Sequence, residues 1–271
     1  MRLVKKALAK GFNGLGYEVH RKSDEHDLFN FNNFVNLTQA YEQSLNESGS
    51  QIKTDEIRPK LIARLAGTPP SEAYAIIDSL AKSNNIDGDI CEFGVAQGET
   101  SALIANEIKT SNKILHLFDS FEGLPKPSEK DQLKDDIFSL GSMEAYAGAM
   151  SRPEELVRSR LNDIAFPEEK FVIHKGFVDQ VFKNDANLPN KVSFAYVDFD
   201  FYEPIKLALE FLHNTAPCGA IFVVDDYDYF STGAKTAVEE FLEEKNSQSE
   251  AYECFVPNTR YGHFAILTRK N

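Results

Sequence analysis

The sequence has few cysteines and no long apolar run. Only three cysteines occur in 271 residues, Cys91, Cys218 and Cys254, and none has the paired spacing of a zinc site or a disulfide framework. We expect all three to be reduced core thiols of a cytoplasmic protein. No stretch has the length and apolar character of a transmembrane helix, and the N-terminus lacks the apolar core of a signal peptide.

Positive charge is also scarce. The chain has 29 Lys and Arg against 42 Asp and Glu, which gives a net charge of −13. Because a nucleic-acid backbone is bound by basic patches, this balance excludes nucleic acid as the main partner. The exception is the opening segment, residues 2–22, which has the pattern of an amphipathic basic arm. We expect this arm to pack on a neighbouring subunit or on the protein's own surface, in a homo-oligomer, with weak contact to an anionic membrane surface as the alternative.

The spacing of apolar residues divides the chain at about residue 86. Residues 1–86 have helical periodicity and predict an N-terminal helical arm or extension. In residues 87–271 strands and helices alternate, which specifies an α/β fold with a parallel sheet and helices on both faces. Two final strand-like runs predict an antiparallel hairpin that closes the sheet. The expected strands are 90–95, 114–118, 171–174, 192–197 and 220–224, the hairpin strands 251–256 and 261–268, and the expected helices 99–108, 205–212 and 234–242.

The turn after the first expected strand lacks the G-x-G-x-x-G spacing of dinucleotide-binding proteins. From Glu92 to Ser101 it reads EFGVAQGETS, with two glycines that let the backbone approach a ligand, although tight helix packing would also explain them. A carboxylate beside this turn repels phosphate and attracts an ammonium or sulfonium group. Asp119 ends the second strand, where an acid accepts hydrogen bonds from ribose hydroxyls. Together with the closing hairpin, these features indicate S-adenosylmethionine.

The residues expected to bind this cofactor lie on three successive turns. The methionine end is expected near Glu92 and the ribose on Asp119. The adenine is expected near Phe121 and Phe177, each of which could equally be a core residue. The full set is Glu92, Gly94, Val95, Gly98, Ser101, Asp119, Ser120, Phe121, Gly176 and Phe177.

Two acidic clusters follow the last two expected parallel strands. Asp198 and Asp200 come after one strand, and Asp225 and Asp226 after the next. Carboxylates at the carboxyl ends of neighbouring parallel strands converge, and oxygen ligands without His or Cys favour Mg²⁺, with Ca²⁺ or Mn²⁺ as substitutes. Any one of these acids alone would more simply cap the next helix. We expect Asp200 to support the cation site from behind its ligands or to cap the helix near Pro204.

Four segments, in order, resemble the macrocin and mycinamicin O-methyltransferase family, metal-dependent enzymes that methylate sugar hydroxyls. They are Glu92–Gly98, Phe118–Pro125, Asp198–Glu203 and Asp225–Tyr227. The resemblance implies a class I S-adenosylmethionine-dependent methyltransferase, with a Rossmann-like, seven-stranded, mostly parallel sheet. It also implies Mg²⁺ held by Asp198, Asp225 and Asp226. The acceptor would be a hydroxyl of a natural-product glycoside, a polysaccharide or a glycolipid, with a phenol or catechol as an alternative.

A sugar hydroxyl is a poor nucleophile, so an enzyme must take its proton or stabilise the forming alkoxide. Asp198 is the first candidate for the catalytic base, besides its role as a ligand. His263, expected on the last strand, is the second, although a strand histidine bonded to backbone or water is an equally good interpretation. Phe201 and Tyr202 occupy the region where catechol-type relatives often carry a lysine, so no lysine base is expected.

A long connection at about residues 120–167 predicts a lid over the acceptor, or a small helical subdomain that only packs. Two other functions account for part of the sequence. A metal-dependent glycosyltransferase would use Asp198-Phe-Asp200 as a D-x-D motif, but this leaves Glu92 and the Asp225–Asp226 pair unexplained. A non-catalytic interaction protein on a methyltransferase fold is the other hypothesis.

Overall fold

The computed structural model describes residues 24–249 and 251–270. The chain divides into two compact units, residues 1–44 and 45–271. The first unit contains most of helix α2 (Asp24–Glu47), and the second contains the sheet and all later helices. The basic arm expected at residues 2–22 lies outside the described residues. Residues 45–86 belong to the same unit as the sheet, and the catalytic-domain boundary at residue 86 stays a prediction.

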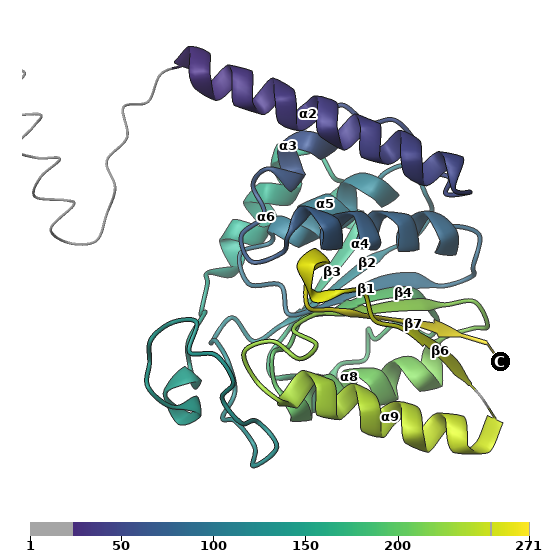
Figure 1. The fold of residues 1–271 in the computed structure, drawn as a ribbon. Coiled ribbons are helices and arrows are strands. Elements are labelled where there is room, and N and C mark those ends of the chain that lie inside the picture. The colour runs from purple at the N-terminus through teal and green to yellow at the C-terminus, as the bar shows by residue number, and fades with distance from the viewer. Residues whose placement is uncertain (1–23, 250, 271) are drawn as a thin grey trace, which may run out of the picture. The chain divides into compact units, whose positions relative to one another are not determined.

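The second unit is built on a seven-stranded sheet with the order β3-β2-β1-β4-β5-β7-β6 (Figure 1). Five strands are parallel, and β7 runs antiparallel to both β5 and β6. The α/β fold with a closing antiparallel hairpin is therefore confirmed. The strands are β1 (Asp89–Phe93), β2 (Leu115–Asp119), β3 (Phe171–Lys175), β4 (Val192–Val197), β5 (Ile221–Val224), β6 (Tyr252–Phe255) and β7 (Ala265–Arg269).

Helices cover both faces of the sheet, as expected for parallel strands joined by helical crossovers (Figure 1). One face carries α4 (Pro70–Ser83), α5 (Glu99–Ile108) and α6 (Glu154–Asp163), and the other carries α8 (Tyr202–Thr215) and α9 (Gly233–Ser249). Helix α7 (Val178–Asn184) packs against α8. A short helix, α3 (Arg58–Ile62), precedes α4. Helix α7 was not predicted, since seven residues are too few for a periodic signal. In the described part of the chain, no helix is both long and apolar enough to cross a membrane.

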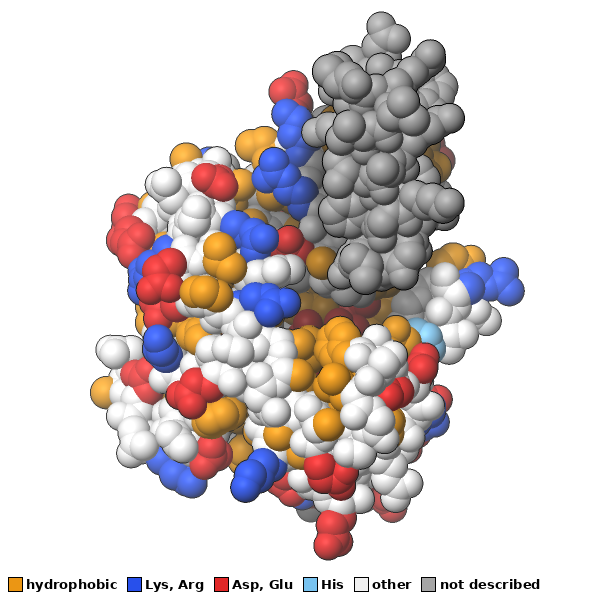
Figure 2. Space-filling model, turned by 90° about the vertical axis from the view of Figure 1, so that its left-hand side faces the viewer, with side chains coloured by type: hydrophobic (Ala, Val, Ile, Leu, Met, Phe, Trp, Pro, Cys, Tyr) orange, Lys and Arg blue, Asp and Glu red, His pale blue; other side chains and the backbone are white. Residues whose placement is uncertain are grey.

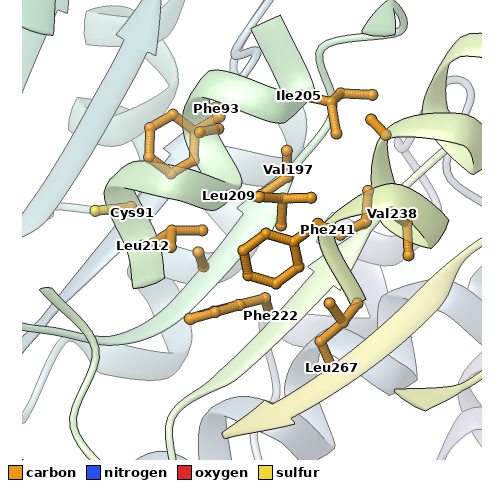
Figure 3. Packing of buried hydrophobic residues seen from close by; sticks show 14 of the residues in the cluster. Cys91, Phe93, Val197, Ile205, Leu209, Leu212, Phe222, Val238, Phe241 and Leu267 are labelled. Carbon is orange, nitrogen blue, oxygen red and sulfur yellow. The ribbon is translucent and has the colours of Figure 1, made fainter. Parts of the chain in front are cut away.

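A large core cluster lies between the sheet and helices α8 and α9. Every residue of β4 is buried, because a central parallel strand is covered on both faces. Figure 3 shows the sheet side chains meeting those of the two helices. The labelled residues are Cys91, Phe93, Val197, Phe222 and Leu267 from the strands, Ile205, Leu209 and Leu212 from α8, and Val238 and Phe241 from α9.

The cysteine prediction was correct for one residue of three. All three thiols are free, but only Cys91, in the middle of β1, is buried. Cys218 is exposed in the turn before β5, and Cys254 is exposed on the edge strand β6. An apolar run beside a strand does not specify burial where that run lies in a turn or at the edge of a sheet.

Candidate active site

The carboxyl ends of the parallel strands open into one cavity of about 730 Å³. Residues from the ends of five strands line it: Gly94, Asp119, Gly176, Asp198 and Asp225. Figure 2 shows the face of the molecule with this opening, where acidic side chains lie deep in a hollow and hydrophobic ones gather around it. The cavity lies where open α/β sheets bind their ligands.

Gly94 allows two strand ends to come together. Its φ is +86°, and a Cβ on it would lie 1.7 Å from the carbonyl oxygen of Asp198. The amide of Asp198 donates to the carbonyl of Phe93 at 2.7 Å, and the amide of Gly94 donates to the carbonyl of Phe118 at 2.9 Å. Only glycine satisfies both the conformation and the space. The backbone that carries Asp198 is thereby held against the end of β1.

Asp119 organises the glycine turn. Its Oδ2 accepts hydrogen bonds from the amides of Val95 (2.7 Å) and Ala96 (2.8 Å), and its Oδ1 accepts one from the amide of Phe121 (2.6 Å). Ala96 and Phe121 have φ values of +46° and +58°, conformations that surrounding contacts must impose on residues with side chains. Oδ1 has a further lone pair, whereas the two amides occupy both lone pairs of Oδ2. The ribose role of Asp119 stays a prediction.

Two buried polar side chains, Glu92 of β1 and Ser101 of α5, lie behind the glycine turn. Glu92 is 1% exposed, Ser101 is fully buried, and neither side chain has a hydrogen-bond partner among the described residues. Burial raises the pKa of Glu92 to about 8; the nearby Ser101 hydroxyl opposes this rise, and the charge of Asp119 adds to it. An unpartnered buried carboxyl is costly. It suits a ligand that brings a donor or a positive group, as the amino group and sulfonium of S-adenosylmethionine would.

The cavity brings together half of the residues expected to bind the cofactor. Those that line it are Gly94, Asp119, Ser120, Gly176 and Phe177. Those that do not line it are Glu92, Val95, Gly98, Ser101 and Phe121. Gly98 precedes α5 with φ +78°, and a Cβ on it would lie 3.0 Å from the Cα of Val157 in α6. Helix packing therefore accounts for this glycine.

Three acids form a tight group at the wall of the cavity. Asp198, Asp200 and Asp226 each offer one carboxylate oxygen, and these oxygens lie within 4.8 Å of one another. Burial raises the pKa of all three carboxyls, and repulsion between neighbouring acids adds to this. Asp200 and Asp226 also have left-handed φ values of +63° and +55°. Carboxylate oxygens that lie this close repel one another, and left-handed φ values in residues with side chains are strained. A hard divalent cation bound by these oxygens would offset their repulsion.

Asp225 differs from its neighbour. Its Oδ2 lies 2.7 Å from the hydroxyl of Tyr196, and its Oδ1 accepts a hydrogen bond from the amide of Asp226 at 2.7 Å. The Tyr196 hydroxyl also lies 3.2 Å from Oε1 of Glu72, which is 1% exposed in the first turn of α4. Burial raises the pKa of Glu72 well above its usual range. Asp225 still lines the cavity, and its assignment as a cation ligand stays a prediction.

Asp200 does not cap helix α8. The amide of Tyr202, the first residue of α8, donates at 2.8 Å to Oδ1 of Asp131, which lies 71 positions earlier. Asp131 is 5% exposed and accepts a second set of hydrogen bonds from Ser128 through its Oδ2. The helix start is therefore capped from the long connection, and Asp200 is free to join the acid group.

His263 lies before the last strand and not on it. A short 3₁₀ turn (Thr259–Tyr261) separates the two hairpin strands, and β7 begins only at Ala265. The Nδ1 of His263 is buried without a hydrogen-bond partner among the described residues. Its ring lies 4.8 Å from that of Tyr229, which lines the cavity. His263 is therefore one side chain away from the cavity, and its role as a base stays a prediction.

The long connection forms one wall of the cavity. Its own small core consists of Leu124, Met143 and Tyr146 packed with Phe201 and Phe230. The connection contributes to the lining through Leu124, Pro125, Ile137, Phe138 and Met150, among others. Helix α6 lies near the end of the same connection. The connection is thus placed as a lid would be, and closure over an acceptor stays a prediction.

A segment of the expected N-terminal extension also lines the cavity. Ala66, Gly67 and Thr68, between α3 and α4, belong to the lining. The amide of Ala66 donates at 2.8 Å to Oε2 of Glu99, and the other oxygen of Glu99 pairs with Arg160 at 2.9 Å. Both oxygens of Glu99 are therefore occupied, and the binding of a positive cofactor group by Glu92 stays a prediction.

Comparison with known proteins identifies the family and the fold. The family model of macrocin O-methyltransferase (TylF) matches residues 18–254. The O-methyltransferase NovP superposes with a TM-score of 0.61 at 20% identity, covering 76% of this chain and 84% of its own. CalS11, a calicheamicin methyltransferase, superposes with a TM-score of 0.60 at 20% identity, covering 92% of this chain and 94% of its own. TomG from Streptomyces achromogenes, solved with S-adenosylmethionine, superposes with a TM-score of 0.50 at 17% identity, covering 84% of this chain and 95% of its own.

No curated protein sequence matches the chain. At these identities the solved structures show the shared fold, which is the class I methyltransferase fold. The family model spans most of the chain and includes the glycine turn, Asp119 and both acidic clusters. The chain therefore belongs to the TylF family of macrocin O-methyltransferases and is an S-adenosylmethionine-dependent O-methyltransferase.

Proposed function

We propose that the protein methylates a hydroxyl of a sugar and that it requires Mg²⁺ held at the acid group. The observation that carries this proposal is the convergence of Asp198, Asp200 and Asp226 on one wall of the cavity that Asp119 also lines. Asp198 and Asp226 belong to both the expected ligand set and the observed group. Asp225 completes the expected set and holds the amide of Asp226.

The chemistry places different demands on different residues. A divalent cation at this wall would stabilise negative charge on the acceptor oxygen. The contact with Gly94 holds the backbone of Asp198 in place. Asp198 is the first candidate to accept the proton of the acceptor hydroxyl. It would do so as the hydroxyl oxygen bonds to the methyl carbon and the carbon–sulfur bond of the donor breaks. Glu92 and Asp119 would orient the donor. The apolar side chains of the long connection would keep water from the reacting groups.

Two findings support a sugar as the acceptor. The family is named for macrocin O-methyltransferase, and the relative CalS11 is a TDP-rhamnose 3′-O-methyltransferase. The cavity, at about 730 Å³, has room for a donor and an acceptor, and its lining includes Leu124, Phe138 and Met150. An acceptor that joins a polar sugar to a larger apolar group fits that lining. The acid group would then face the diol of the sugar.

The test is a calorimetric titration of S-adenosylmethionine, with and without Mg²⁺, into wild type, Asp119→Ala and Asp226→Asn. We expect cofactor binding to be lost in Asp119→Ala and kept in Asp226→Asn, whereas Mg²⁺ binding should show the reverse pattern. Sugar acceptors are then screened for methyl transfer with and without a chelator. Full activity in the presence of the chelator would refute the cation requirement, and activity confined to phenols would refute the sugar acceptor.

A further inference from the structure

A buried hydrogen-bonded chain connects helix α4 to the acid group. It runs from Glu72 through the hydroxyl of Tyr196 to Asp225, and from Oδ1 of Asp225 to the amide of Asp226. The distances are 3.2, 2.7 and 2.7 Å. Tyr196 is 0% exposed and Glu72 is 1% exposed. The chain therefore links three separate elements, α4, β4 and the end of β5, in a place closed to solvent.

The end of this chain is a strained turn. Asp226 has φ +55°, and such a conformation persists in a residue with a side chain only when its surroundings impose it. The carboxylate of Asp225 accepts the amide of Asp226 on one oxygen and lies against Tyr196 with the other. Removing the Tyr196 hydroxyl takes away the donor to Oδ2 of Asp225 and leaves Glu72 as the remaining buried polar neighbour of that carboxylate. The carboxylate that accepts the Asp226 amide is then held less firmly. The orientation of the Asp226 carboxylate depends on that turn.

We infer that Glu72 and Tyr196 are positioning residues that hold the Asp225–Asp226 turn in the conformation that binds the divalent cation. The inference rests on the proposed cation site. It adds that a helix from the segment before the sheet completes this site. Partners behind metal ligands hold those ligands in place in the same way in other metal sites.

The segment that leads into the helix carrying Glu72 also borders the cavity. Ala66, Gly67 and Thr68, just before α4, line the same cavity as the acids.

The experiment is a Mn²⁺ titration of the full chain, with Tyr196→Phe compared with Tyr146→Phe. Tyr146 is a matched control, because it is also 0% exposed and its hydroxyl also donates to an aspartate, Asp136, at 2.9 Å. We expect Tyr196→Phe to weaken Mn²⁺ binding by about 10- to 100-fold. Tyr146→Phe should bind Mn²⁺ as wild type does. Both variants should bind S-adenosylmethionine as wild type does when no cation is present.

The outcomes separate this inference from the proposed function. If wild type and Tyr196→Phe bind Mn²⁺ equally, the inference is overturned and the cation site stands. Equal weakening in Tyr146→Phe also overturns it, because the loss would then report general loosening. A wild type that binds S-adenosylmethionine but no divalent cation overturns both the inference and the cation requirement.

A second pair of variants decides the matter if Tyr196→Phe does not fold. Glu72→Ala removes the outer partner of the Tyr196 hydroxyl, whereas Glu72→Gln keeps an oxygen in the same place and adds a donor. We expect weaker Mn²⁺ binding in Glu72→Ala and recovery in Glu72→Gln, with the unfolding temperature as a check on folding. Wild-type Mn²⁺ affinity in Glu72→Ala would refute a positioning role.

Discussion

Gly94 offers the sharpest test of how the fold builds the site, through the substitution Gly94→Ala. The new Cβ would lie 1.7 Å from the carbonyl oxygen and 2.7 Å from the carbonyl carbon of Asp198, both backbone atoms. Asp198 cannot simply move away, because its amide is bonded to the carbonyl of Phe93 at 2.7 Å. The clash must therefore separate the end of β1 from the end of β4.

Two contributions set the magnitude. A left-handed φ of +86° costs a residue with a Cβ about 1–2 kcal/mol. Forcing an extra methyl group into a packed site costs about 1–3 kcal/mol more. The sum, about 2–5 kcal/mol, is a large part of the free energy of unfolding of an ordinary domain. The displaced Asp198 should also weaken cation binding.

The assay is urea denaturation with Gly141→Ala as the control. Gly141 has nearly the same φ, +87°, but beyond its chain neighbours no atom lies within 4 Å of the position that a Cβ would take, so only the conformational cost applies. We expect Gly94→Ala to lower the free energy of unfolding clearly more than Gly141→Ala does, and to weaken Mn²⁺ binding where the control does not. Equal destabilisation by the two substitutions would refute the close approach of Gly94 and Asp198.

Two further predictions concern stability. Asp131→Ala removes the acceptor for the first amide of α8 and should lower the free energy of unfolding by about 1–3 kcal/mol. Asp135→Ala, at an exposed neighbouring position, should have little effect. Urea denaturation of both variants checks this. Burial lowers the pKa of His174, although its hydrogen bond with Asp185 at 2.6 Å opposes this. The unfolded chain therefore binds this proton more readily, and the free energy of unfolding should fall as the pH drops below about 6.5. This fall in the free energy of unfolding should be smaller in His174→Gln than in wild type. Identical pH profiles of stability for wild type and His174→Gln would contradict the role of His174.

The strands were predictable because their signal is local. A central parallel strand such as β4 is covered on both faces, so its run, Val192–Val197, is mostly apolar, and that run can be recognised without knowing its partners. The last strand shows where this fails. Its apolar pattern starts at Tyr261, but the Asn258 side chain accepts from the amide of Arg260 and closes a 3₁₀ turn. Gly262 then adopts φ +125°, so β7 begins at Ala265.

The location of the site was also predictable, whereas its internal arrangement was not. Residues after parallel strands meet at one edge of a sheet, which is why Asp119, Asp198 and Asp225 line the same cavity. Asp200 was expected to cap α8 or to lie behind the cation ligands. Because Asp131 accepts the first amide of α8, the Asp200 carboxylate instead joins the group of three acids. Glu72 gave no signal, since an acid in the first turn of a helix is common.

The sequence by itself therefore determined the α/β class, the closing hairpin, the methyltransferase motifs and the edge where the acids gather. Each of these depends on residue types that recur at short spacing. Only the tertiary structure decided which acids face one another and what holds them. Those contacts join positions far apart in the chain, such as Glu72 and Tyr196, which are separated by 124 positions. No short-range pattern encodes such a pair, because its energy comes from burial and hydrogen bonds that exist only once the helices and strands have packed.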